Sequence, residues 1–192
     1  MATTKVLLVD GQWLFKRNFK SQPNLKSSNG NLCGGITGFM FSLKSIINKI
    51  IPDRVVIAWD GFQAGKLRYN IYPPYKASRG KDWANEERAL RNNGTGSPED
   101  MEKIEFIKQK ILTQNIMDEL FVRQAESDYV EADDIIAQYV LKSDDDEIIY
   151  IFSRDKDYLQ LITERVFVIT SDSLWTLNRA EYEKKIWPHN RK

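Results

Sequence analysis

The chain has 192 residues, of which 42% are hydrophobic and 29% are charged, and this balance predicts one globular domain with a full apolar core. Five Trp, eight Tyr and nine Phe exclude a disordered, solvating chain. The net charge of +1 indicates no class of partner, and no stretch approaches the roughly 18 apolar residues of a membrane span. The single cysteine, Cys33, excludes an internal disulfide, so we expect a reducing, cytoplasmic location away from membranes.

Two short apolar runs in the first third of the chain each end in the dipeptide Asp-Gly. Residues 5–9 (KVLLV) predict a buried strand that ends at Asp10. Because this strand begins so close to the N-terminus, we expect no signal peptide. Residues 54–59 (RVVIAW) predict a second buried strand, which ends at Asp60. Between them, apolar residues at helical spacing over 34–51 predict a helix.

The rest of the chain predicts strands that alternate with helices. Residues 62–98 lose apolar periodicity, so we expect an excursion from the core with a short helix over 83–91. Beyond it we expect helices from 97 or 98 to 114, over 130–141, over 157–162 and over 179–186, and strands over 120–124, 148–152, 166–170 and 174–177. This alternation is typical of an α/β fold in which a mostly parallel sheet has helices on both faces.

Aspartates follow three of the predicted strands. Asp10, Asp60 and Asp155 each stand where an apolar run ends, and one aspartate at such a place is ordinary turn chemistry. In an open α/β sheet, however, ligands bind beyond the carboxyl ends of the strands. Three carboxylates at this edge would repel one another unless a cation lay between them. Together the three positions therefore predict a cation site.

Four more acids extend this set, three of them at the start of the helix over 130–141: Glu131, Asp133, Asp134 and Asp157. For the first three, the structural alternative is capping of that helix. His189 is the only histidine, so the whole set offers oxygen ligands. Oxygen ligands suit Mg²⁺ or Mn²⁺ rather than zinc, and two such ions are the usual machinery of phosphodiester hydrolysis. We therefore expect two Mg²⁺ ions, for which Mn²⁺ can substitute.

Charge is unevenly distributed along the chain. Residues 126–147 hold nine acids against a single lysine and could hold cations. Residues 66–81 hold five cations and no acid, so a polyanion could dock on them. Taken alone, these runs favour the alternative of two solvated faces of opposite sign. The five cations are Lys66, Arg68, Lys76, Arg79 and Lys81.

Five motifs occur in the order in which a known nuclease family carries them. They are VDG at 9–11, AWDG at 58–61, YPPYKASR at 72–79, EADDIIA at 131–137 and SRDKDYLQL at 153–161. Over residues 5–187 the chain resembles the N-terminal, PIN-like catalytic domain of the 5′ nucleases. This family includes flap endonucleases, the 5′ nuclease domains of bacterial DNA polymerase I and phage 5′–3′ exonucleases. EADD-x-IA together with S-x-DKD-x-x-QL is the most specific part of the resemblance.

The resemblance implies a three-layer PIN-like domain and a metal-dependent 5′ nuclease that cuts DNA at flaps or single-stranded 5′ ends in replication or repair. The seven acids described above match the metal-binding acids of the family. Tyr75, Lys76 and Arg79 match the base of a helical arch, which would make 62–98 an arch insertion. There the Lys and Arg steer the scissile phosphate and stabilise its charge, and the Tyr stacks on a base.

Two cations beside that motif are further candidates for contact with the nucleic acid. Arg68 precedes the motif, and it either contacts phosphate or pairs with a nearby acid. Lys81 follows the motif within the basic run. Family members also continue into further metal-binding aspartates and a helix-three-turn-helix part that grips the duplex. We find no such segment in residues 1–192, so the resemblance implies one half of a split or truncated enzyme. We expect the other part either on a separate chain or on a longer form of this protein.

Three other functions are alternatives to this interpretation. A PIN-type ribonuclease uses a similar acidic cluster, but the long 62–98 insertion and the DKD-x-x-QL segment argue against it. An aspartyl phosphotransferase of the haloacid dehalogenase type needs an aspartate two residues after Asp10, where this chain has Gln12. A non-catalytic DNA-binding or scaffold subunit that depends on a partner chain remains an alternative.

Overall fold

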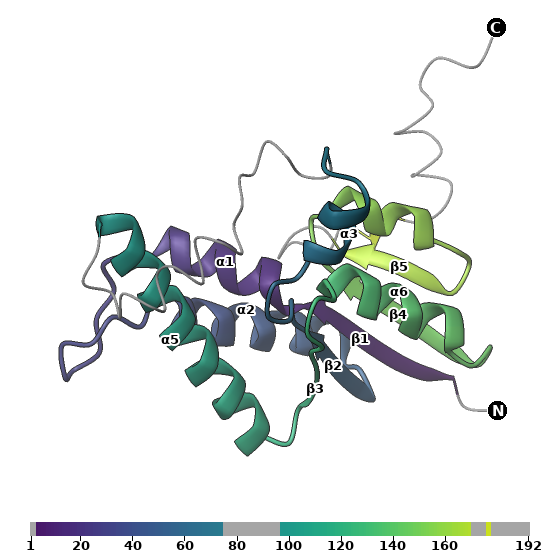
Figure 1. Ribbon diagram of the computed structural model, residues 1–192. Coiled ribbons are helices and arrows are strands. Elements are labelled where there is room, and N and C mark those ends of the chain that lie inside the picture. Colours follow the sequence, from purple (N-terminus) through teal and green to yellow (C-terminus); the bar gives the residue numbers. More distant parts are fainter. Residues whose placement is uncertain (1–2, 75–96, 170–175, 178–192) are drawn as a thin grey trace, which may run out of the picture.

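The fold is built around one six-stranded sheet (Figure 1), seen in a computed structural model that describes residues 3–74, 97–169 and 176–177. The strands lie in the order β3-β2-β1-β4-β5-β6. Their bounds are Thr4–Asp10 for β1, Arg54–Ala58 for β2, Arg123–Ala125 for β3, Glu147–Phe152 for β4, Val166–Ile169 for β5 and Thr176–Leu177 for β6. Strands β1 to β5 pair in parallel and β6 pairs antiparallel to β5, so the predicted mostly parallel sheet is confirmed.

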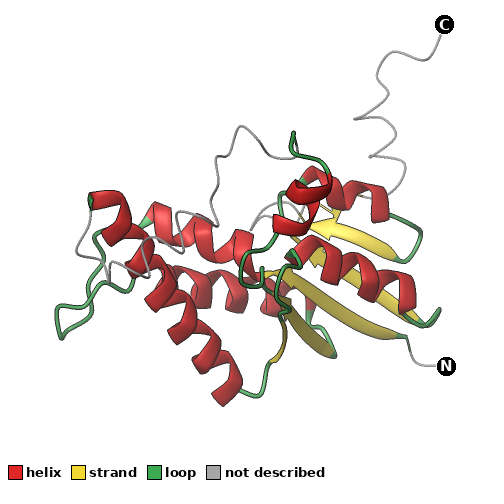
Figure 2. Cartoon of the chain, viewed as in Figure 1, coloured by secondary structure: helices red, strands yellow, loops and turns green. Residues whose placement is uncertain are grey.

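Helices cover both faces of this sheet (Figure 2). Their bounds are Gly11–Ser21 for α1, Gly34–Ile50 for α2, Lys66–Ile71 for α3, Pro98–Glu119 for α5, Ala132–Lys142 for α6 and Lys156–Leu161 for the 3₁₀ helix η2. Successive side chains of a strand point to opposite faces. Leu7 and Val9 of β1 therefore pack with α1, α2 and α5, whereas Val6 and Leu8 pack with α6 and η2. The predicted three-layer α/β architecture is confirmed.

Helix α1 is the largest element that the sequence did not predict. Its first turn is capped by Asp10, whose side chain accepts a hydrogen bond from the Trp13 N–H at 2.9 Å. Leu14, Phe15 and Phe19 then form one buried face. Asp10-Gly11 also has the composition of a turn. We therefore interpreted it as the end of a strand and did not predict the helix that Asp10 caps.

Helix α5 is longer than predicted, and the next strand starts later. It begins at a capping box between Ser97 and Asp100 and runs to Glu119, five residues beyond the predicted end. Met117 is fully buried against the core, which extends the helical packing beyond residue 114. The following strand accordingly occupies Arg123–Ala125 instead of 120–124.

Some predicted elements fall outside the described residues, namely the helices over 83–91 and 179–186 and much of the insertion over 62–98. Within that insertion the structure places α3, directly above the start of α6 in Figure 1. Within the described residues, no helix is long and apolar enough to cross a membrane.

Ile51 ends α2 in a strained conformation, and we expect its replacement by glycine to stabilise the protein. Its φ of 49° lies in the left-handed region, which disfavours side chains branched at Cβ, and its side chain is 74% exposed. Ile51→Gly should raise the free energy of unfolding by about 1 kcal/mol in chemical denaturation. The control is Ile51→Ala, which loses the same exposed side chain but keeps Cβ. An equal gain in both variants would show that backbone strain is not the cause.

Candidate metal centre

Three predicted aspartates meet at one edge of the sheet because they follow adjacent parallel strands. Asp10 is the last residue of β1, and Asp60 and Asp155 stand just beyond the ends of β2 and β4, the two neighbours of β1. A cavity of about 890 Å³ opens there. Five of the seven predicted acids line it, namely Asp10, Asp60, Glu131, Asp133 and Asp155.

The glycine that follows each of the first two aspartates allows close packing of the backbone at this edge. A Cβ at Gly11 would lie 2.6 Å from the Ile57 side chain and 2.9 Å from the Ala58 oxygen. At Gly61 it would lie 1.8 Å from the carbonyl oxygen of Ser127. The two Asp-Gly dipeptides therefore combine a carboxylate with the only residue type that fits beside it.

Asp10 is the most buried of the three strand-end aspartates, at 7% exposure. Its Oδ1 accepts the Trp13 N–H at 2.9 Å, and its Oδ2 accepts the hydroxyls of Ser153 at 3.0 Å and Tyr158 at 3.2 Å. Burial raises the pKa of Asp10 to about 6, and the nearby charge of Asp60 adds to this in spite of the three hydrogen bonds. A buried carboxylate of this kind favours a cation beside it.

Asp60 connects β2 to α6 and α5. Its Oδ1 accepts the backbone N–H of Ala132 at 2.8 Å and so caps α6 from outside that helix. Its carbonyl oxygen accepts a hydrogen bond from Lys110 Nζ at 2.9 Å. The same ammonium group lies 3.1 Å from Glu126 Oε1 and 5.7 Å from the centre of the Trp59 ring. Lys110, which the sequence interpretation did not single out, thus fixes the Asp60 loop.

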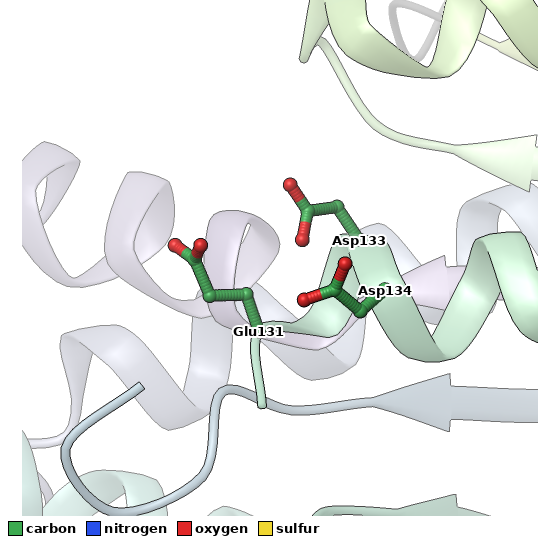
Figure 3. A group of neighbouring side chains, drawn as sticks. All are labelled: Glu131, Asp133 and Asp134. Carbon is green, nitrogen blue, oxygen red and sulfur yellow. The ribbon is translucent and has the colours of Figure 1, made fainter. Parts of the chain in front are cut away.

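Three acids gather at the start of α6 (Figure 3), and each has a carboxylate oxygen within 4.8 Å of the others. Arg68 of α3 lies among them. Its guanidinium donates to Glu131 Oε2 at 2.8 Å and to Asp134, and it lies 3.8 Å from Asp133. Arg68 thus pairs with nearby acids in this structure, and its contact with phosphate stays a prediction. Within the described part of the chain, this guanidinium contacts all three carboxylates of the cluster.

The segment after β4 places Asp155 in the cavity and Asp157 outside it. Asp155 accepts the N–H of Asp157 at 3.1 Å and so caps η2, while its own N–H donates to Ser153 Oγ at 3.1 Å. Asp157 is exposed and is not among the cavity-lining residues. Asp134 likewise does not line this cavity, although it adjoins Glu131 and Asp133.

Tyr158 is a site residue that the motif contained but the sequence interpretation did not use. It is 1% exposed and donates to Asp10. Burial raises its pKa, and the charges of Asp10, Asp133 and Asp155 raise it further. One hydroxyl therefore lies within electrostatic reach of three acids from three different elements. The signal that could have found it is its position directly after the D-K-D sequence and before Leu159.

The cavity also carries cations and aromatic rings. Of the residues predicted to contact nucleic acid, only Arg68 is described, because Tyr75, Lys76, Arg79 and Lys81 lie outside the described residues. Lys16 and Lys20 of α1 and Lys103 of α5 line the cavity together with Trp13 and Phe106. Lysines next to aromatic rings suit the binding of single-stranded nucleic acid, because the lysines attract its phosphates and its bases stack on the rings.

The acid set fits divalent cations on three counts. Every donor is a carboxylate oxygen, which suits a hard cation. Asp10 is buried with a raised pKa, and Glu131, Asp133 and Asp134 crowd their oxygens within 4.8 Å. A divalent cation at this cavity would neutralise charges that otherwise repel one another.

The pKa of Asp10 predicts a pH-dependent stability of the metal-free protein. Because folding raises this pKa from 3.8 to about 6, the folded state binds the proton more tightly, and stability falls as the pH rises between these values. The loss should reach about 3 kcal/mol above pH 6. In EDTA, Asp10→Asn should therefore be stabilised relative to the natural protein at pH 7.5, and much less so at pH 4. A pH-independent difference in urea denaturation would contradict this.

Comparison with known proteins agrees with this arrangement. The family described as the 5′-3′ exonuclease N-terminal resolvase-like domain matches residues 5–187. A 5′-3′ exonuclease of Mycoplasmopsis pulmonis is 30% identical over 184 residues, which cover 92% of this chain and 52% of that protein. The chain thus spans about half of this relative.

Two solved phage structures share the fold. The T5 5′-exonuclease with bound divalent zinc ions has a TM-score of 0.63 at 18% identity, covering 93% of this chain and 60% of that one. A bacteriophage T5 flap endonuclease in complex with DNA and metal ions has a TM-score of 0.60 at 16% identity, covering 94% and 60%. The family match extends over nearly the whole chain, and the chain belongs to the 5′-3′ exonuclease N-terminal resolvase-like domain family.

Proposed function

We propose that this chain is the catalytic part of a divalent-metal-dependent 5′ nuclease that hydrolyses DNA at flaps or single-stranded 5′ ends. The observation that best supports this proposal is the cavity at the carboxyl ends of β1, β2 and β4. It is lined by five carboxylates, those of Asp10, Asp60, Glu131, Asp133 and Asp155. We propose two Mg²⁺ ions as the natural cofactors, with Mn²⁺ able to substitute, because the ligands are all carboxylates. The half-buried single cysteine, Cys33, supports a reducing, cytoplasmic location.

The acids would bind the cations from different elements of the fold. Asp10, Asp60 and Asp155 would hold cations from the strand ends, and Glu131 and Asp133 would hold them from α6. Asp134 and Asp157 would complete the outer edge of the set. Bound divalent cations would lower the pKa of an attacking water and stabilise the leaving oxygen of an in-line displacement. Because hydroxyls and backbone N–H groups already orient Asp10 and Asp60, these carboxylates need little rearrangement to act.

DNA binding would use the cations on either side of the acids. Lys76 and Arg79 would stabilise charge on the scissile phosphate, with Tyr75 and Lys81 beside them in the proposed arch. Lys16, Lys20 and Lys103 line the cavity and would contact the phosphates of the strand. The phage flap endonuclease that shares this fold forms a complex with DNA and metal ions, which supports a DNA substrate.

We further propose that tight binding of the duplex needs the part that the relatives carry beyond the region matched here, whether on the same chain or on a separate one. The matched region spans 52% of the Mycoplasmopsis exonuclease. Non-specific DNA affinity comes mainly from phosphate contacts, so each missing contact lowers both the affinity and its salt dependence.

The test is cleavage of a labelled 5′-flap DNA by the purified chain in millimolar Mg²⁺, with EDTA as control. An RNA flap and a blunt DNA duplex are measured in parallel. Metal-dependent cutting of the DNA flap is the expected result. Preferred cutting of RNA would instead favour a ribonuclease. The same assay is repeated with the part that the relatives carry beyond the matched region. If the chain then still binds DNA without cutting it, a non-catalytic subunit would be favoured.

A further inference from the structure

Two hydroxyl groups hold the same oxygen of Asp10. Ser153 Oγ donates to Asp10 Oδ2 at 3.0 Å, and the Tyr158 hydroxyl donates to that oxygen at 3.2 Å. Within the described residues, the other oxygen, Oδ1, accepts only the Trp13 N–H, at 2.9 Å. Ser153 is 0% exposed and Tyr158 is 1% exposed, so water does not compete for these contacts.

The two carboxylate oxygens of Asp10 differ in the number of acceptor sites that remain free. A carboxylate offers about four acceptor sites, two on each oxygen. The two hydroxyls use both sites of Oδ2, and Trp13 uses one of those on Oδ1. One acceptor site remains, and it is on Oδ1. Tyr158 has a single proton to donate, and its hydroxyl donates that proton to Oδ2.

We propose that Tyr158, together with Ser153, is a positioning residue that fixes Oδ2 of Asp10 and leaves Oδ1 as the oxygen that binds the divalent cation. This inference rests on the proposed function, since it takes Asp10 to be a metal ligand. Hydrogen-bond partners behind a metal ligand orient it and tune its basicity, and their loss typically lowers metal affinity about 10- to 100-fold. Without the Tyr158 hydroxyl, the Asp10 carboxylate would be held only by Ser153 and Trp13 among these donors, and it would be less well stabilised as an anion.

The test is a Mn²⁺ titration followed by electron paramagnetic resonance on the full chain, with the melting temperature recorded in EDTA. Tyr158→Phe removes one hydroxyl and keeps the ring, so we expect Mn²⁺ binding about 10-fold weaker with the fold retained. Ser153→Ala removes the other donor and should act in the same direction. The matched control is Tyr139→Phe on α6, which removes a hydroxyl that contacts Arg54 outside the metal cavity and should leave Mn²⁺ affinity unchanged.

A double variant separates a positioning role from a general structural one. If Tyr158 acts only through Asp10, adding Tyr158→Phe to Asp10→Ala should weaken Mn²⁺ binding no further. Unchanged affinity in Tyr158→Phe, with or without a lower melting temperature, would overturn the proposal. If Tyr158→Phe does not fold, unchanged affinity in Ser153→Ala overturns it equally. A natural chain that binds no Mn²⁺ would instead refute the metal-dependent function itself.

Discussion

Asp133→Ala should abolish cleavage while leaving the metal-free fold at least as stable as that of the natural protein. Asp133 lines the cavity, and its carboxylate lies within 4.8 Å of those of Glu131 and Asp134. Losing a metal ligand should slow cleavage by about 10³-fold or more, because a metal ion supplies several kcal/mol of charge stabilisation. Single-turnover rates on a flap substrate and melting temperatures in EDTA measure the two effects.

The expected stability follows from the charge at this end of α6. Among the described residues, these three carboxylates contact the guanidinium of Arg68, which keeps its contacts to Glu131 and Asp134 when Asp133 is removed. Removing one like charge therefore relieves repulsion in the absence of metal. Glu119→Ala is the control, since it deletes an exposed acid at the far end of α5. Full activity in Asp133→Ala would refute the metal-ligand assignment, and inactivity with a much lower melting temperature would indicate unfolding instead.

Much of this site could be predicted from sequence because its acids are tied to regular elements. A strand that ends in aspartate places that carboxylate at the ligand-binding edge of a parallel sheet. Recognising the preceding strands was enough to place Asp10, Asp60 and Asp155 at this edge. The apolar, β-branched sequences made these strands clear. Glu131 and Asp133 needed only the start of α6.

The parts that could not be predicted depend on contacts between residues far apart in sequence. Ser153 and Tyr158 lie 143 and 148 residues from Asp10, and no local pattern shows that they share one of its oxygens. Lys110 reaches the carbonyl oxygen of Asp60 across 50 residues. Helix α1 was missed for a different reason, since the Asp that ends β1 also caps the helix.

The contacts of Arg68 bring the predicted arch and the predicted metal centre together. Arg68 belongs to α3, at the start of the segment that leads to Tyr75, Lys76 and Arg79, and it pairs with Glu131 and Asp134. A cation bound by Glu131 would share that carboxylate with Arg68. The position of α3 is therefore linked to the charge state of the acids.

Lys76→Ala should slow the cleavage step by roughly 10²- to 10³-fold while changing DNA affinity little. The reason is that a cation at the scissile phosphate matters most as negative charge develops in the transition state, whereas many other contacts share the ground-state binding. Single-turnover rates in Mg²⁺ and DNA affinities in EDTA separate the two effects.

Lys76→Arg keeps the charge and should retain more activity. Lys142→Ala removes a lysine of α6 outside the metal cavity and should change neither the cleavage rate nor the DNA affinity. Lys76 lies outside the described residues, so this expectation stands on the YPPYKASR resemblance alone. If Lys76→Ala weakens binding as much as it slows cleavage, Lys76 docks the DNA, and the charge developed during hydrolysis must be stabilised by other groups.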